Sequence, residues 1–348
     1  MVMATREAVD LRGLVDRRLD ELLESEMGRL AFLAEEDRET LRRHLVEFVR
    51  TGGKRLRPAF VYWGHRAAGG SPADQDAVLA AGCAVELLHA SALILDDVMD
   101  ESATRRGHPT AHVALAERHR RSGWWGDPAR YGESVATLLG MLAFTWADAA
   151  LLSGDGAAEA LQVFTQLRVE IIAGQYLDLA YAARGVAGVE AAARVSIYKS
   201  GKYTVERPLH LGHAIAAGDP AIKEVLSAYA LPLGEAFQLR DDVLGVFGDP
   251  GHTGKPAGTD LRQGKRTYLT AETRERAGGG TLLDEVRDEA DVAAARELIV
   301  ATGALDAVER RITALVADAV QALDDDRVPQ DARQALVDLA AIATSRTS

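Results

Sequence analysis

Apolar residues recur at helical spacing along nearly the whole chain, and alternating strand patterns are scarce. The periodic stretches are rich in Ala, Leu, Glu and Arg, which are strong helix formers, and Gly and Pro clusters separate them. We predict helices at about 7–33, 37–50, 55–68, 74–102, 109–120, 131–153, 156–183, 189–217, 220–247, 267–276, 281–301, 304–323 and 330–344. No fixed-period repeat and no disordered linker divides the chain. We therefore expect one all-α domain over residues 1–348, a helix bundle around a central cavity.

The charge balance and the cysteine count restrict the function and the compartment. Against 52 Asp and Glu stand 40 Lys and Arg, a formal net charge of −12. Nucleic-acid phosphates require a basic face, so we expect no nucleic-acid partner. Cys83 is the one cysteine, which excludes a disulfide framework and fits a reducing compartment. The N-terminal residues lack a signal-peptide core and no apolar run reaches membrane-spanning length, so we expect a cytoplasmic protein without a membrane span.

A first acidic cluster follows the apolar run 90–95 and consists of Asp96, Asp97 and Asp100. Asp96 and Asp100 are one helical turn apart on the same face. Carboxylates placed this closely repel one another unless a cation binds, and Mg²⁺ prefers hard oxygen ligands together with substrate phosphate. The alternative interpretation is a solvated acidic helix end, which a short motif alone does not exclude.

A second acidic pair, Asp241 and Asp242, also ends a long apolar helix and is preceded by Gln238. One such pair is weak evidence, but two on separate helices can face each other in a bundle. Both clusters would then open into one cavity and hold a diphosphate between metal ions.

Basic residues stand where an anion would bind. Lys54, Arg55 and Arg57 follow a Gly-Gly turn and open a helix, whose free N–H groups and dipole also favour an anion. Arg105 and Arg106 follow the first acidic cluster, and arginine grips diphosphate oxygens bidentately. A solvated basic turn and a surface salt-bridge patch are the alternatives.

Further lysines stand in two later segments. Lys199 is followed by Ser200, and Lys255 and Lys265 lie in a polar, Gly-rich stretch after the second acidic pair. Lysines in such a stretch can close over a phosphate and exclude water.

The combined pattern resembles the trans-isoprenyl diphosphate synthases, the polyprenyl synthetase family. The matching segments are GGKRLRP at 52–58, LLHASALILDDVMDESATRRG at 87–107, GQYLDL at 174–179, YKSGKYTVERPLHLG at 198–212 and FQLRDDVLGVFGDPGHTGKPAGTDLRQGKR at 237–266. The similarity spans about residues 30–300 and keeps the family's order and spacing.

The resemblance implies a role for each matching residue. It implies an isopentenyl diphosphate site made of Lys54, Arg57, His89 and Arg106. It implies contacts to an allylic diphosphate from Arg105, Lys199, Ser200, Gln238, Lys255 and Lys265, with Gln175 and Asp178 as a polar pair nearby. It implies magnesium ligands at Asp96, Asp100 and Asp241, with Asp97, Asp242 and Lys199 completing the catalytic set.

The activity that the resemblance implies is a magnesium-dependent prenyl transfer by a homodimer. Magnesium and the basic residues would stabilise the departing diphosphate of dimethylallyl, geranyl or farnesyl diphosphate. The double bond of isopentenyl diphosphate would attack the allylic cation head to tail. The released diphosphate would then accept the proton, since no side chain is obviously placed for it, and the cavity must exclude water.

Two positions depart from the family pattern. The family often has a third aspartate four residues after the first of its second cluster, and this chain has Gly245 there. One carboxylate fewer would weaken a metal held on that side. Ser200 stands where the family often has threonine, which keeps the hydroxyl.

The depth of the cavity should set the length of the product. Ala92 lies one turn before Asp96, about 6 Å below it, with Ser91 beside it. Both are small, so the growing tail can pass, and Leu88 one turn further forms part of a floor. We therefore favour the twenty-carbon geranylgeranyl diphosphate. The alternative is that small residues here only allow close helix packing.

Two other functions remain open from the sequence. A terpene cyclase is also helical and rich in aspartate, but it needs no second diphosphate site of the kind that Lys54, Arg57, His89 and Arg106 suggest. A non-catalytic subunit that binds prenyl diphosphates would explain Gly245, but not the complete first cluster.

Overall fold

The computed structural model describes residues 10–51, 53–155, 157–186, 188–248, 258–279, 282–284 and 286–345. The elements are α1 (Leu11–Gly28), α2 (Glu35–Leu41), π-helix η1 (Arg42–Val46), α3 (Glu47–Arg50), α4 (Leu56–Ala67), 3₁₀ turn η2 (Pro72–Asp74), α5 (Gln75–Met99), β1 (Thr104–Arg105), β2 (His108–Pro109), α6 (Ala111–Ser122), α7 (Pro128–Leu152), α8 (Ala157–Arg184), α9 (Val189–Val195), π-helix η3 (Ser196–Glu206), α10 (Arg207–Ile215), α11 (Pro220–Phe247), α13 (Thr259–Arg262), α14 (Tyr268–Arg276), 3₁₀ turn η4 (Leu282–Asp284), α15 (Glu289–Ala301), α16 (Ala304–Ala322) and α17 (Gln330–Thr344). The all-α prediction is confirmed.

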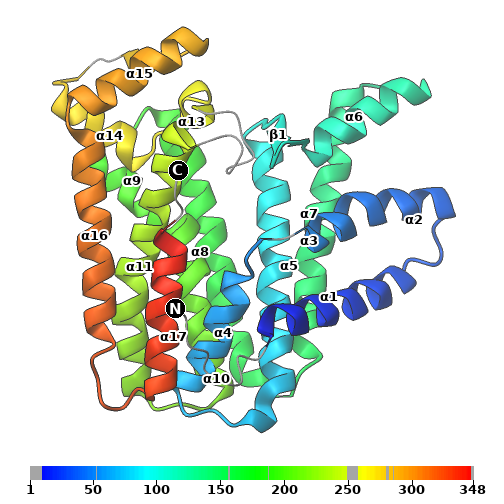
Figure 1. The fold of residues 1–348 in the computed structure, drawn as a ribbon. Coiled ribbons are helices and arrows are strands. Elements are labelled where there is room, and N and C mark those ends of the chain that lie inside the picture. Colours follow the sequence, from blue (N-terminus) through cyan, green and yellow to red (C-terminus); the bar gives the residue numbers. More distant parts are fainter. Residues whose placement is uncertain are drawn as a thin grey trace.

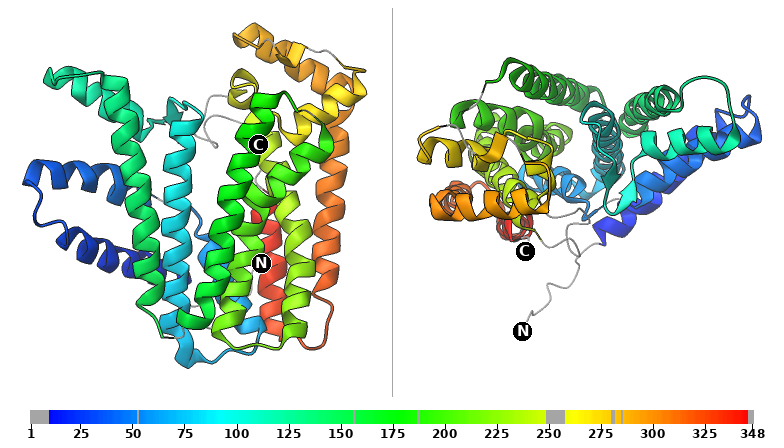
Figure 2. Two further views of the ribbon diagram at one scale, coloured as in Figure 1. Left: turned by 180° about the vertical axis from the view of Figure 1, so that it is seen from behind. Right: turned by 90° about the horizontal axis from the view of Figure 1, so that it is seen from above.

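The long helices start where the sequence supplies caps. Asp127 accepts a hydrogen bond from the N–H of Arg130 and Pro128 opens α7; Asp219 accepts from the N–H of Ala221 at the start of α11. These helices and α5, α8, α16 and α17 stand roughly upright as a bundle, and the α1–α2 hairpin projects to one side (Figures 1 and 2).

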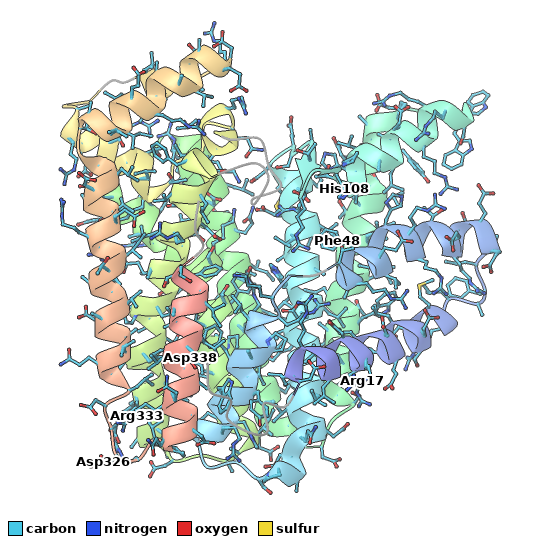
Figure 3. All side chains as sticks on the ribbon, viewed as in Figure 1. Arg17, Phe48, His108, Asp326, Arg333 and Asp338 are labelled. Atoms are coloured by element: carbon cyan, nitrogen blue, oxygen red, sulfur yellow. The ribbon has the colours of Figure 1, made fainter. Side chains whose placement is uncertain are left out.

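Three apolar clusters hold the bundle together. The first packs α1, α5, α7 and α8; the second packs α4, α11 and α17; the third packs the end of α11 against α13 to α16. Charged side chains cover the outside, as Arg17 on α1 and Asp338 on α17 show (Figure 3). The two acidic clusters therefore end helices that belong to different packed groups, with the space between them left for a site.

Several predicted helices differ in detail. The helices expected at 37–50 and 189–217 are interrupted by the π-helices η1 and η3, the one expected at 7–33 ends at Gly28, and the one expected at 281–301 begins at Glu289. The helix expected at 74–102 ends at Met99, and a two-stranded hairpin follows in which Thr104 pairs with Pro109. The hairpin turn is left-handed at Arg106 and Gly107, a conformation whose propensity is weak for arginine.

Two helices are long and apolar enough to cross a membrane, 72–99 and 128–152, which corrects the expectation that no apolar run reaches that length. This test uses length and composition only. Of the apolar window in 72–99, 72% is buried inside the protein, as expected of a core helix, against 44% in 128–152. The second helix therefore leaves an apolar face uncovered.

Candidate functional site

A cavity of about 1330 Å³ opens between α5, α8, η3 and α11, with the start of α4 at one side. The sequence-predicted residues that line it are Lys54, Arg57, Leu88, His89, Ser91, Ala92, Asp96, Arg105, Arg106, Gln175, Asp178, Lys199, Ser200, Gln238, Asp241, Asp242 and Lys265. Asp97 and Asp100 are not part of the lining, and Lys255 lies outside the described residues. Segments more than two hundred positions apart in the sequence, such as those of Lys54 and Lys265, thus meet in one space.

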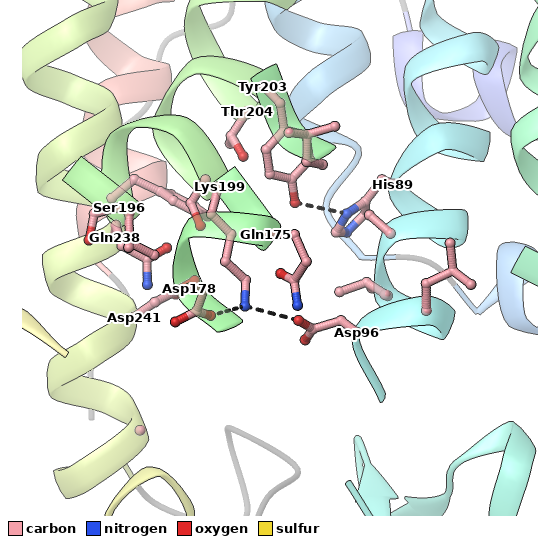
Figure 4. Close-up of a pocket in the computed structure, with 18 of the residues that line it drawn as sticks. His89, Asp96, Gln175, Asp178, Ser196, Lys199, Tyr203, Thr204, Gln238 and Asp241 are labelled. Atoms are coloured by element: carbon pink, nitrogen blue, oxygen red, sulfur yellow. Dashed lines mark hydrogen bonds and ion pairs between the residues drawn. The ribbon is translucent and has the colours of Figure 1, made fainter. Parts of the chain in front are cut away.

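The first acidic cluster faces lysines across the cavity. Lys199 Nζ lies 3.0 Å from Asp96 Oδ1 and 2.6 Å from Asp178 Oδ2 (Figure 4). Burial raises the pKa of Asp96, but the charges of Lys199 and Lys265 outweigh it and hold that pKa below its ordinary value. Burial lowers the pKa of Lys199, and Asp96 and Asp178 raise it further than that. The aspartate and both lysines are therefore charged at neutral pH.

The other two members of the first acidic cluster, Asp97 and Asp100, contact different partners. Asp97 is buried, and Arg105 donates to it from Nε at 2.7 Å. Asp100 ends α5, and Lys265 Nζ lies 3.0 Å from its Oδ2. Asp97 thus anchors the hairpin arginine beside the cavity, while Asp100 connects α5 to the segment after α13.

The two members of the second acidic pair, Asp241 and Asp242, also differ in their surroundings. Asp241 lines the cavity opposite α5 (Figure 4). Asp242 is buried and accepts hydrogen bonds from Gln238 Nε2 at 2.8 Å and from the N–H of Tyr268 at 3.1 Å. Burial raises the pKa of Asp242 to about 8 against the Gln238 hydrogen bond, with the charge of Asp260 adding to the rise. In the metal-free protein Asp242 is therefore largely protonated at neutral pH.

Gly245 is the position where the family pattern has a third aspartate. A Cβ atom on Gly245 would lie 1.8 Å from Asp260 Oδ2. The carboxylate of Asp260, carried by the short helix α13, therefore occupies the space beside α11 that a side chain at residue 245 would need. Asp260 also lines the cavity. A carboxylate thus stands at this place although the helix itself does not supply it.

A cationic group occupies the opposite end of the cavity. Arg57 donates from Nη2 to Tyr203 Oη at 2.8 Å and to Thr204 Oγ1 at 2.9 Å. Arg106 donates to the backbone carbonyl of Thr51 at 2.8 Å. Within the described residues neither arginine, nor Lys54, has a carboxylate partner. Burial and then the charge of neighbouring Arg105 lower the pKa of Arg106, so an anion bound here would relieve repulsion between cations.

His89 lies in the cationic end of the cavity. Its Nδ1 is 3.2 Å from Tyr203 Oη (Figure 4). Burial and then the charge of Arg57 hold the pKa of His89 well below its ordinary value, so the ring is neutral. Since Arg57 already donates to Tyr203, the hydroxyl donates to Nδ1, and Nε2–H is left as a donor for an anion.

Close backbone contacts hold the π-helix η3 that carries Lys199. A Cβ on Gly174 of α8 would lie 2.4 Å from the Lys199 N atom, and a Cβ on Gly234 of α11 would lie 2.8 Å from the Gly201 Cα. Only glycine allows these approaches. The wider π turn then directs Lys199, Tyr203 and Thr204 into the cavity.

An apolar arm of the cavity runs down from the aspartates. Its lining includes Leu88, Ser91 and Ala92 of α5, Ile171 of α8 and Phe144 of α7. The guanidinium of Arg168 lies 5.3 Å from the Phe144 ring centroid and pairs with Asp148, which helps to fix the position of the ring. The small residues Ser91 and Ala92 both line this arm.

The donor set suits a hard divalent cation. Among the described residues, no group of three His, Cys, Asp or Glu side chains converges as a closed metal site. The aspartate oxygens on α5 instead carry lysine ammonium groups at 3.0 Å, and Asp241 faces them from α11. Carboxylates spread around an open cavity fit Mg²⁺, which keeps waters and completes its octahedron with substrate phosphate.

Four residues of the site escaped the sequence interpretation: Tyr203, Thr204, Phe144 and Asp260. The first two follow Lys199 by four and five positions, but α-helical spacing gives no hint that a π turn points both toward Arg57. Phe144 belongs to a helix with apolar residues on several sides, and the contact of Asp260 with Gly245 joins two segments that periodicity cannot pair.

Comparisons with known proteins agree with this geometry. Residues 38–301 match the sequence model of the family described as polyprenyl synthetase. A crystal structure of geranylgeranyl pyrophosphate synthase from Corynebacterium glutamicum, complexed with isoprenyl diphosphate and magnesium, has a TM-score of 0.93 and 38% identity, covering 98% of this chain and 100% of that one. Geranylfarnesyl diphosphate synthase of Aeropyrum pernix is 32% identical over 272 residues, 76% of this chain and 81% of its own. (2E,6E)-farnesyl diphosphate synthase of Mycobacterium tuberculosis is 31% identical over 259 residues, 71% of this chain and 67% of its own.

Proposed function

Because this chain belongs to the polyprenyl synthetase family, it is a prenyltransferase, and we propose that it elongates an allylic diphosphate with isopentenyl diphosphate to geranylgeranyl diphosphate. The observation that carries the proposal is the division of one cavity into two differently charged ends. One end combines carboxylates with lysines. At the other end Arg57 and Arg106 have no carboxylate partner among the described residues, and the carboxylate of Glu86 is paired with Arg55. Two diphosphates, one bound with metal and one without, match this division.

The cationic end is the proposed isopentenyl diphosphate site. Its positive charges come from Lys54, Arg57 and Arg106, which have no carboxylate partner among the described residues. His89 adds a neutral N–H donor. The opposite end would hold the allylic diphosphate through Arg105, Lys199 and Lys265, with Gln238, Ser200 and Lys255 at its edges. His89 and Asp96 are seven residues apart on α5, so the two diphosphates would lie about 10 Å apart along the helix.

The chemistry follows from where charge develops. The bond between the allylic carbon and its diphosphate oxygen breaks, and the leaving diphosphate takes the electron pair. Lys199 and Lys265 stabilise the charge on its oxygens. The isopentenyl double bond, held by Arg57 and its neighbours, attacks the allylic cation, and the released diphosphate accepts the proton. The apolar arm keeps water from the cation.

Magnesium is the proposed cofactor, with Asp96, Asp100 and Asp241 as ligands and Asp260 in place of the carboxylate absent at Gly245. When bound, Mg²⁺ would neutralise the departing diphosphate. Its positive charge would also lower the pKa of Asp242, which burial raises to about 8 in the metal-free protein. The ligand chemistry and the glycine contact support this assignment.

Product length is proposed to follow the apolar arm. Ser91 and Ala92 leave room one turn below Asp96, Phe144 of α7 borders the arm at the level of Ser91, and Leu88 lies one turn further down α5. The relatives named above make farnesyl, geranylgeranyl and geranylfarnesyl products by name, so the family name alone does not decide between them. The small side chains of Ser91 and Ala92 support the twenty-carbon product.

A homodimer of one-domain subunits in the cytoplasm is the proposed assembly. Exposed apolar side chains support this proposal. Leu138, Met141 and Leu152 on α7 and Val169 and Ile172 on α8 are each 56–61% exposed to solvent. Their helical spacing makes two neighbouring apolar stripes. A second copy of the chain would cover them without any membrane contact. Sedimentation velocity tests this directly, since a monomer at micromolar concentration would contradict it.

The proposed activity is tested by product analysis. Purified protein is incubated with Mg²⁺, labelled isopentenyl diphosphate and farnesyl diphosphate, and the dephosphorylated products are sized. We expect a twenty-carbon alcohol that disappears in Asp96→Ala and persists in Asp338→Ala, an exposed aspartate on α17 outside the cavity. Longer alcohols would retain the chemistry and refute the assigned floor. No condensation with any allylic starter would refute the proposed function.

A further inference from the structure

Arg55 lies in the middle of the basic turn, yet its side chain does not face an anion. Its backbone is left-handed, with φ 53° and ψ 40°, and it precedes the first residue of α4. The guanidinium is only 5% exposed. It donates to Asp16 Oδ1 at 2.8 Å, to Glu86 Oε2 at 2.6 Å and to the carbonyl of Val49 at 2.9 Å. One buried cation thus connects α1, α3 and α5.

The left-handed turn directs the neighbours of Arg55 toward the cavity. Lys54 is exposed on one side of it, and Arg57 lies in the first turn of α4 on the other. A non-glycine residue in this conformation is strained, and such strain persists only where surrounding contacts fix the backbone. The three hydrogen bonds of Arg55 supply those contacts. The orientation of both basic side chains therefore depends on a residue that offers its own charge elsewhere.

Glu86 explains why this charge matters. Its carboxylate is 5% exposed and lies one turn before His89 on α5, inside the cationic end of the cavity. Its charge already raises the pKa of Arg106 against the effects of burial and of Arg105. A buried carboxylate that has lost its partner forms an ion pair with the nearest available cation. Arg55 therefore keeps Glu86 occupied and leaves Arg57 and Arg106 for a ligand.

We propose that Arg55 is a positioning residue for the isopentenyl diphosphate site, which holds the turn of Lys54 and prevents Glu86 from neutralising Arg57 and Arg106. The inference rests on the proposed function, because it assumes that the cationic end binds this substrate. It predicts an effect on one substrate only, since the carboxylate end of the cavity lies a further seven residues along α5 from His89.

The test is a double-mutant cycle of Arg55→Gln and Glu86→Gln. The KM for isopentenyl diphosphate, the KM for farnesyl diphosphate and kcat are measured, together with calorimetric binding of isopentenyl diphosphate without Mg²⁺. Arg55→Gln should raise the KM for isopentenyl diphosphate at least about tenfold, because Glu86 then pairs with Arg57 or Arg106 and the substrate loses a charged contact. It should change the KM for farnesyl diphosphate less than about twofold. The double variant should recover to within about threefold of wild type, and Arg55→Lys should fall between.

Arg18→Gln is the matched control. Arg18 also connects α1 to α5, through Asp76 at 3.3 Å, but at the surface and away from the cavity. It should leave all three constants unchanged. If Arg55→Gln raises both KM values together, or if the double variant is no better than the single one, the role is merely structural and the inference is overturned. The double variant has no unpaired buried charge, so it decides the question even if Arg55→Gln fails to fold.

The proposed function and the inference fail in different ways. Wild-type protein that condenses nothing refutes the function, whatever Arg55 does. Wild-type protein that condenses both substrates, with unchanged isopentenyl diphosphate binding in Arg55→Gln, refutes the inference alone.

Discussion

Replacing Phe144 with alanine should lengthen the product by one isoprenyl unit. Helices α5 and α7 run in opposite directions, and a Cβ on Gly140 would lie 2.6 Å from Leu95 Cγ. Phe144, one turn further along α7, therefore stands at the level of Ser91, about 7.5 Å below Asp96. Truncation to alanine removes a ring of about the volume of one five-carbon unit, and the tail can fill the space that opens. We expect twenty-five-carbon product to replace most of the twenty-carbon product.

The assay is the sizing of dephosphorylated products at saturating substrate. Phe144 is half-buried, so the unfolding free energy should fall by less than the roughly 3–5 kcal/mol typical of a fully buried phenylalanine. Phe48→Ala is the matched control, since Phe48 is half-buried against the same apolar cluster but does not line the cavity. It should cost similar stability and leave product length unchanged. A folded Phe144→Ala enzyme with unaltered product would refute the assigned floor.

Three further predictions concern the metal side, the π-helix and pH. Asp260→Asn should weaken Mn²⁺ binding to the metal-free protein, followed by electron paramagnetic resonance, several-fold more than Asp318→Asn on the surface of α16. Gly174→Ala should push η3 from α8 and reduce kcat at least about tenfold, whereas Gly28→Ala, with open space around it, should slightly raise the melting temperature. His210 is buried, and burial lowers its pKa to about 4 from 6.5, so protonation opposes folding. The contribution of neutral His210 to the unfolding free energy is fully present above pH 6.5. It is lost as the pH falls to about 4, by on the order of 3 kcal/mol. The unfolding free energy of His210→Gln, measured by denaturation over the same pH range, should not show this loss.

The direction of the His210 effect follows from its hydrogen bonds. Arg207 donates to Nδ1 at 3.0 Å, and Nε2 lies 2.9 Å from Ser227 Oγ, which in turn donates to Glu206 at 3.0 Å. The ring accepts at Nδ1 only while it is neutral, so protonation breaks the contact with Arg207. A stability curve that is flat from pH 7 to pH 4 would contradict this reading.

Much of the site was readable because its residues lie in contiguous motifs. The spacing of four residues alone places Asp96 and Asp100 on the same helix face. Lys54 and Arg57 follow a turn that two consecutive glycines predict. Helical periodicity located the long helices, and the position of each acidic pair at the end of an apolar helix predicted that the two can meet in one cavity. These features depend on local sequence, where propensity and pattern agree.

What escaped prediction depends on contacts between distant segments. The π-helix η3 is set by backbone approaches at Gly174 and Gly234, and neither glycine signals a partner in the sequence. Gly245 read as a missing carboxylate because only the fold brings Asp260 beside it. Arg55 read as one more cation for an anion, whereas its partner Glu86 lies 31 positions away and buries the charge. The sequence interpretation placed the two apolar helices within a few residues of their observed bounds. It did not recognise them as apolar enough to cross a membrane, because small and polar residues break their apolar runs.

Equilibrium binding of each substrate with and without metal tests the central claim most directly. Isopentenyl diphosphate and a non-reactive thio-analogue of farnesyl diphosphate are titrated separately into the protein, first with chelator and then with Mg²⁺. Binding of isopentenyl diphosphate should not depend on Mg²⁺ and should be lost in Arg57→Ala, because Arg57 and Arg106 have no carboxylate partner among the described residues and Glu86 is paired with Arg55. Binding of the farnesyl analogue should require Mg²⁺ and be lost in Asp96→Ala. Metal-dependent binding of isopentenyl diphosphate, or loss of the farnesyl analogue in Arg57→Ala, would contradict the division of the cavity into two ends.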